Sequence, residues 1–198
     1  KTEKSHIHCA ALTPEEAYVC LVDVGTDEIL VYAADSLELV DTVKFPEGSG
    51  PRHIVFSSKG SYAYVITESS SEVFLMAYTP EQERKLVILG SNSTEPVGFG
   101  GAAGIRISPG ERFVLASNRN ADSISVFQIR ENGWLRLVYN EIVPCGCPRD
   151  FQFTPDGKWV IAGLQTTDRL AVYKFNENGT MEQVSFVDEI ERPTCIVF

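Results

Sequence analysis

The stretch PRDFQFTPDGKWVIAGLQTTDRLAVYKF, residues 148–175, contains three short apolar runs separated by turns. The first run ends at Thr154 and is followed by Pro-Asp-Gly, a tight-turn sequence. The second run begins at Trp159 and the third at Leu170, and none of them continues with a 3.6-residue period. The stretch therefore predicts three antiparallel strands joined by tight turns.

The same layout occurs four times along the chain. The residues that close the first run are Thr13, Ser57, Ser108 and Thr154, which are 44, 51 and 46 residues apart. The residues that open the third run show the same three intervals, and they are Ile29, Val73, Ile124 and Leu170. A weaker fourth strand is predicted each time, at 39–45, 85–90, 135–141 and 181–187. The longer second interval is interpreted as an extended, Gly-rich loop over residues 91–101.

Short strands with a super-period of about 45 residues are typical of β-propeller blades. We expect an all-β chain with a single propeller domain over residues 1–198. Its four four-stranded blades are predicted at approximately 6–46, 50–91, 102–143 and 147–188. Residues 193–198 align with 51–56 and are expected to form the first strand of a further blade.

Blades hide their faces against one another, so a row of blades either closes into a ring or exposes apolar surface. We therefore expect the chain to be part of a larger ring, with assembly of two copies as the alternative. Open blade faces and unpaired edges would in either case favour self-association.

The net charge of −10 argues against a nucleic-acid partner, because phosphate binding needs clustered Lys and Arg. No apolar run approaches the ~18 residues of a membrane helix, so no membrane contact is expected. The five cysteines include Cys145-Gly-Cys147 but no paired metal spacing, and they are interpreted as free thiols in a reducing compartment. Without the apolar region of a signal peptide behind Lys1, we expect a cytoplasmic protein.

Four motifs resemble those of a known family. They are Ser5–His8 leading to Asp23–Asp27, Gly50–His53 leading to Glu68, Ser117–Arg119 with Asp122–Phe127, and Pro148–Asp150 leading to Gln165. The chain resembles the lactonase-type seven-bladed propellers, the family of 6-phosphogluconolactonase and carboxymuconate cyclase, and would form their C-terminal part.

Repeat alignment brings several polar residues to equivalent positions. The residues five positions before those that close the first run are His8, Arg52, Ala103 and Arg149. The residues five positions before those that open the third run are Val24, Glu68, Arg119 and Gln165. Because adjacent strands are antiparallel, both positions should lie at one mouth of the channel. Three arginines favour a carboxylate or phosphate ligand, and they would keep a neighbouring glutamate ionised. His8 adds a group that titrates near neutrality.

The resemblance implies a lactonase that hydrolyses a sugar lactone such as 6-phosphogluconolactone without metal or cofactor. It implies four catalytic residues, namely His8, Arg52, Glu68 and Arg119. The substrate-binding residues are expected to be His6, His53, Asn118, Arg149 and Gln165. Ester hydrolysis needs a base, here Glu68 or His8, and positive groups for the oxyanion and the anionic tail, here Arg52 and Arg119.

Other interpretations remain open on the sequence. The same arginines suit a cycloisomerase of a muconate-type diacid, and a non-catalytic propeller would bind a protein partner. Arg52 and Glu68 could form a plain inter-strand salt bridge, His6 and His8 could be surface residues, and His53 a core residue. Asp23 and Asp27 are interpreted as turn-forming residues rather than catalytic acids.

Overall fold

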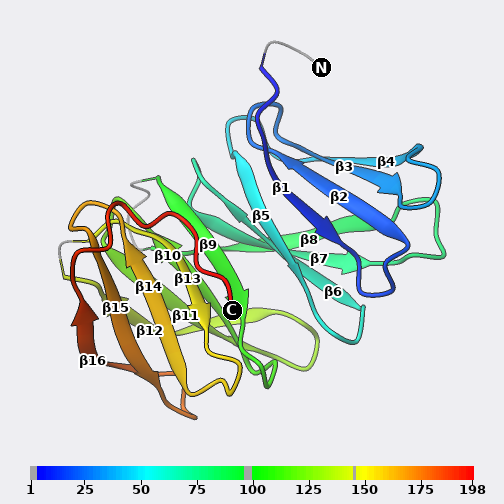
Figure 1. The fold of residues 1–198 in the computed structure, drawn as a ribbon. Coiled ribbons are helices and arrows are strands. Elements are labelled where there is room, and N and C mark those ends of the chain that lie inside the picture. The colour runs from blue at the N-terminus through cyan, green and yellow to red at the C-terminus, as the bar shows by residue number, and fades with distance from the viewer. Residues whose placement is uncertain (1–3, 96–99, 145) are drawn as a thin grey trace. The chain divides into compact units, whose positions relative to one another are not determined.

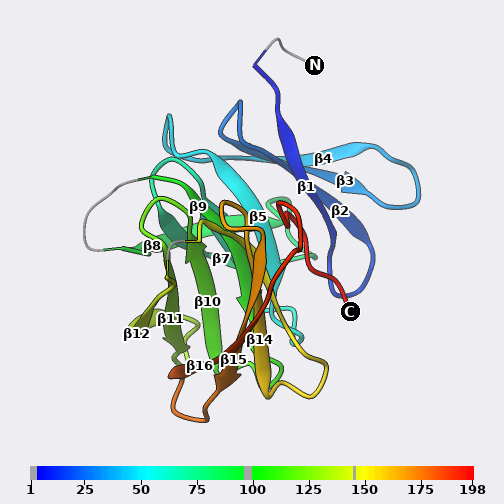
Figure 2. The same cartoon turned by 60° about the vertical axis from the view of Figure 1, so that its left-hand side comes forward.

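The computed structural model describes residues 4–95, 100–144 and 146–198. The described residues form four four-stranded antiparallel sheets, each with its strands in sequence order (Figures 1 and 2). Contacts divide the chain into two compact units, Lys1–Ser93 and Thr94–Phe198. This all-β architecture confirms the predicted propeller blades. Nowhere in the described ranges is there a helix that could span a membrane.

The first unit contains two blades. Its strands are β1 (Ile7–Leu12), β2 (Tyr18–Asp23), β3 (Glu28–Ala33), β4 (Leu39–Lys44), β5 (Pro51–Phe56), β6 (Tyr62–Thr67), β7 (Glu72–Tyr78) and β8 (Leu86–Ser93). The first strands of the two blades, β1 and β5, lie side by side in both views (Figures 1 and 2).

The second unit repeats this plan. Its strands are β9 (Ala102–Ile107), β10 (Phe113–Asn118), β11 (Ser123–Ile129), β12 (Leu135–Ile142), β13 (Pro148–Phe153), β14 (Trp159–Leu164), β15 (Arg169–Phe175) and β16 (Met181–Val187). Here the two first strands, β9 and β13, are neighbours.

A hydroxyl group closes the first turn of every blade. Each side-chain oxygen accepts a hydrogen bond of 3.1–3.2 Å from the backbone N–H five residues later. The four residues are the anchors of the sequence repeat, Thr13, Ser57, Ser108 and Thr154. Ser and Thr recur there because their short hydroxyl groups bond locally to the backbone and fix the turn.

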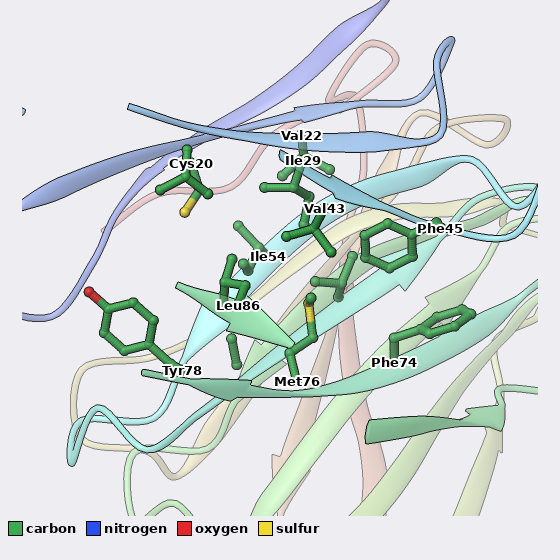
Figure 3. Close-up of a cluster of buried hydrophobic side chains, with 13 residues drawn as sticks. Cys20, Val22, Ile29, Val43, Phe45, Ile54, Phe74, Met76, Tyr78 and Leu86 are labelled. Carbon is green, nitrogen blue, oxygen red and sulfur yellow. The ribbon is translucent and has the colours of Figure 1, made fainter. Parts of the chain in front are cut away.

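Each unit has its own apolar core between its two sheets. In the first unit, alternate residues of one sheet, among them Cys20 and Val22, face Ile54, Phe74 and Met76 of the other (Figure 3). In the second unit, the corresponding cluster forms around residues such as Phe151 and Tyr173. The period-two alternation of the strands thus accounts for both cores.

Two segments, 91–101 and 193–198, differ in part from the prediction. The loop predicted over 91–101 begins later than expected, because β8 continues to Ser93 by pairing with β7 (Glu72 with Ser93); residues 96–99 lie outside the described residues. Residues 193–198 carry no strand; instead the backbone N–H of Ile196 donates to Asp150 Oδ2 at 2.9 Å. That these residues begin a further blade stays a prediction.

Candidate functional site

The end of the second strand lies beside the start of the first strand in all four blades. We call His8, Arg52, Ala103 and Arg149, which lie at the start of the first strands, the ring positions. A backbone N–H after each second strand donates to the carbonyl two residues before the ring position of the same blade. These pairs are Val24 with His6, Glu68 with Gly50, Arg119 with Gly101, and Gln165 with Cys147. Within each blade, therefore, the two sets of positions found by repeat alignment do meet.

In the first unit, four predicted site residues gather at this end. Arg52 Nε donates to Glu68 Oε2 at 3.0 Å, and the His8 and His53 rings lie 5.0 Å apart. The Arg52 side chain is 3% exposed and that of Glu68 is 32% exposed. The arginine is therefore buried, whereas water can reach the carboxylate that is paired with it. His8, on β1, is also exposed.

His53 also contacts this arginine. The Arg52 Nη1 and His53 Nε2 atoms are 3.3 Å apart. Because a guanidinium group can only donate, Nε2 must offer its lone pair, so a proton on that nitrogen would break the contact. His53 thus contacts Arg52 directly, while its role in substrate binding stays a prediction.

Three predicted site residues of the second unit are Arg119, Arg149 and Gln165, and Cys147 lies close to Gln165. Arg119 Nε donates to the Gly101 carbonyl at 2.9 Å, and the Cys147 thiol lies 3.9 Å from Gln165 Oε1. Burial raises the pKa of the Cys147 thiol, while the charges of Arg119 and Arg149 oppose that rise. The half-buried thiol therefore lies within the electrostatic influence of two arginines.

Sequence reasoning did not select Cys147, although a signal was present. Cys147-Pro148-Arg149 aligns with Gly50-Pro51-Arg52, and Gly101 occupies the same place in the third repeat. Cys147 has φ 48° where the two glycines have φ 66° and 84°. A side chain is unusual at a left-handed position that two of its three equivalents, Gly50 and Gly101, leave to glycine, and it marks this loop.

Comparison with known proteins identifies the family of the chain. The sequence profile described as lactonase, 7-bladed beta-propeller, matches residues 1–198. The chain belongs to this lactonase family. The predicted resemblance to lactonase-type propellers is thereby confirmed.

Several known proteins are similar to the chain. An uncharacterised protein of Staphylococcus saprophyticus is 38% identical over 166 residues, covering 78% of this chain and 46% of that protein. The 6-phosphogluconolactonase of Bacillus subtilis is 35% identical over 158 residues, covering 77% and 45%. A periplasmic gluconolactonase structure from Pseudomonas aeruginosa has a TM-score of 0.88 at 30% identity, covering 96% and 56%. The chain thus spans about half the length of the relatives it matches.

His6 and Asp23 have clear places in this lactonase-family chain. The Asp23 carboxylate accepts hydrogen bonds from Ser5 Oγ and from the backbone N–H groups of His6, Gly25 and Thr26. Burial alone would raise the pKa of Asp23, but these hydrogen bonds outweigh it and lower the pKa below its ordinary value. Asp23 therefore fixes the segment that leads to His8, as a turn-forming residue would.

Asn118 is placed differently from what was expected for a substrate-binding residue. Its side chain is fully buried and accepts from Thr94 Oγ1 at 2.6 Å. Its amide nitrogen lies 3.1–3.3 Å from the Thr94 carbonyl and from Ser123 and Ser125 Oγ. This geometry assigns Asn118 to holding the end of β10, so its contribution to binding would act through the neighbouring Arg119.

Metal binding was predicted to be absent. Across residues 4–95, 100–144 and 146–198, no three His, Cys, Asp or Glu side chains are grouped as metal ligands. Cys145, the first residue of the Cys-Gly-Cys sequence, lies outside the described residues. Metal independence therefore stays a prediction.

Proposed function

We propose that the protein hydrolyses an anionic sugar lactone such as 6-phosphogluconolactone, without a metal ion. The observation that carries this proposal is the pair of Arg52 and Glu68, joined at 3.0 Å, with His8 and His53 beside it. A reachable carboxylate, an imidazole and a fixed positive charge are the groups that ester hydrolysis needs.

The reaction would use these groups in two steps. Glu68 or His8 takes a proton from water, whose oxygen attacks the carbonyl carbon of the lactone. Negative charge then develops on the carbonyl oxygen and is stabilised by the nearby arginine charge. The ring C–O bond breaks, the ring oxygen takes up a proton, and the open-chain acid is released.

Binding of an anionic group is also proposed for the second unit, taken by itself. Arg119 follows the second strand of one blade and Arg149 lies at the start of the first strand of the next, and the charges of both oppose the raised pKa of Cys147. Guanidinium groups bind phosphate and carboxylate through paired hydrogen bonds, so these residues suit the anionic tail of a sugar lactone. Gln165, within reach of the Cys147 thiol, adds a polar amide to the same group.

Family membership supports the same reaction class. The Bacillus subtilis relative is named 6-phosphogluconolactonase and the Pseudomonas aeruginosa relative a gluconolactonase. Both names describe lactones of sugar acids. The residues that the proposal uses are those of the motifs on which the resemblance was based.

The test compares turnover of 6-phosphogluconolactone by the protein and by Arg52→Ala and Glu68→Ala variants. Each variant should lose more than ~100-fold in turnover, the size of effect that removal of a base or of an oxyanion partner produces. Glu38→Ala, at an exposed position in the turn before β4, is the matched control and should retain full activity. A loss under about threefold for both site variants, or turnover of a muconate-type diacid in place of the lactone, would contradict the proposal.

A further inference from the structure

The last residue of the turn between the second and third strands has a left-handed backbone in each of the four blades. Its φ is 56° at Asp27, 53° at Ser71, 45° at Asp122 and 55° at Asp168. Asp and Asn tolerate this conformation better than most residues because their short polar side chains bond locally. In three blades, however, the aspartate bonds far along the chain rather than locally.

Each of these aspartates holds the connection to the next blade at two places. Its backbone carbonyl accepts from a residue just after the fourth strand: Phe45 for Asp27, Val143 for Asp122 and Ile190 for Asp168, at 2.7–3.0 Å. Its carboxylate accepts from backbone N–H groups further along the chain: Gly48 and Gly50 for Asp27, Gly146 and Cys147 for Asp122, and Arg192 for Asp168. For Asp27 and Asp122 these groups come shortly before Arg52 and Arg149. The connection is thus fixed at its beginning and at its end.

The carboxylate contacts of Asp27 end two residues before Arg52. Asp27 Oδ2 accepts from the Gly48 N–H and Oδ1 from the Gly50 N–H, both at 2.7 Å. Gly50 is itself left-handed, with φ 66°, and Pro51 follows with a φ that its ring fixes. The direction in which the chain reaches Arg52 is therefore set by one carboxylate, one glycine and one proline.

Asp122 does the same before Arg149. Its Oδ1 accepts from the Cys147 N–H at 2.7 Å and from the Gly146 N–H at 3.3 Å. Cys147 is left-handed and Pro148 follows, as in the first case. In the second repeat Ser71 replaces the aspartate, and the next ring position is Ala103, which has no charged side chain to orient.

We propose that Asp27 and Asp122 are positioning residues that orient the ring arginines Arg52 and Arg149 through the connections they hold. Hydrogen bonds to an ionised carboxylate are stronger than neutral ones, so they can keep a loop rigid. An arginine that must meet an anion in one orientation gains from such a rigid approach. The role in catalysis rests on the proposed lactonase function, whereas the orientation of Arg52 does not.

Two substitutions of the same kind separate this role from general stability. In Asp27→Asn the single carbonyl oxygen can keep only one of the two bonds, because Gly48 and Gly50 use different oxygens. In Asp122→Asn one oxygen can keep both, because Gly146 and Cys147 share Oδ1. Asparagine tolerates the left-handed backbone equally well, so strain does not differ between the two.

The experiment measures hydrogen exchange by NMR at neutral pH. In Asp27→Asn, exchange of the Gly48 or Gly50 amide should accelerate by at least ~10-fold, and that of the Arg52 Nε–H by at least ~3-fold. In Asp122→Asn both bonds are kept but become neutral, so exchange of the Gly146 and Cys147 amides should accelerate less than that of the Gly48 or Gly50 amide in Asp27→Asn. Asp35→Asn, at an exposed turn of the first unit, is the control and should change none of these rates.

Turnover of the lactone adds the functional readout. For Asp27→Asn, kcat should fall by about 10-fold with little change in KM, as expected when a group is misplaced in the transition state. If the glycine amides accelerate while the Arg52 Nε–H does not, the carboxylate only holds the loop and the proposal is wrong. If the wild type does not hydrolyse the lactone, the proposed function fails, while the exchange rates still decide the orientation of Arg52.

Discussion

The pair of Arg52 and Glu68 allows a quantitative prediction about stability. Arg52 is almost fully buried and Glu68 is about one-third exposed, so the two partners are not equivalent. Glu68→Ala leaves a buried guanidinium group without its carboxylate, which should cost about 2 kcal/mol of unfolding free energy. Arg52→Met keeps the apolar stem and leaves a carboxylate that water can solvate, which should cost about 1 kcal/mol for the lost charge interaction.

The double variant isolates the interaction itself. We expect a coupling free energy of about 1–2 kcal/mol, between the values for exposed and buried ion pairs. The free energies come from urea unfolding followed by far-UV circular dichroism. Lys44 and Glu28, joined at 3.3 Å with Lys44 well exposed, provide the control pair, whose coupling should stay below about 0.5 kcal/mol. A coupling below about 0.3 kcal/mol for Arg52 and Glu68 would refute the reasoning.

Three further predictions concern the core, acid stability and thiol reactivity. Met76→Ala should lower the free energy of unfolding by about 2–5 kcal/mol, measured in urea, because Met76 is fully buried between the two sheets of its unit. The lowered pKa of Asp23 means that its contribution is complete above about pH 4 and is lost as pH falls through the folded-state pKa. The stability difference between wild type and Asp23→Asn should therefore be larger at neutral pH than in strong acid. Burial raises the pKa of Cys20 to about 12, so a thiol reagent at neutral pH should label the exposed Cys195 and leave Cys20 until the protein unfolds.

The strand plan could be predicted because the physics that sets it is local. The anchors Thr13 and Ser57 were recognisable as repeated positions, and the structure shows why, since each hydroxyl caps its own turn. The neighbouring positions of Arg52 and Glu68 followed from antiparallel pairing alone. Both inferences need only the strand period and the direction of adjacent strands.

The roles that the sequence did not predict depend on contacts between residues far apart in the chain. Asp27 looked like a turn residue, and its bonds to Gly48 and Gly50 span more than twenty positions, so no local pattern indicates them. Asn118 stands next to Arg119 in a motif, yet its side chain points into a buried network with Thr94. The direction of a polar side chain at a strand end depends on the loop that covers it. The strand period does not predict the path of that loop.

The most direct test of the central claim is hydrolysis of 6-phosphogluconolactone by the protein after treatment with a chelator, compared with Glu68→Gln under the same conditions. Spontaneous hydrolysis in buffer is subtracted from both. We expect that the chelator leaves turnover unchanged and that Glu68→Gln lowers it by more than ~100-fold, because glutamine keeps the hydrogen-bonding oxygen but cannot take a proton. Loss of activity with the chelator, or a Glu68→Gln variant within about threefold of wild type, would contradict it.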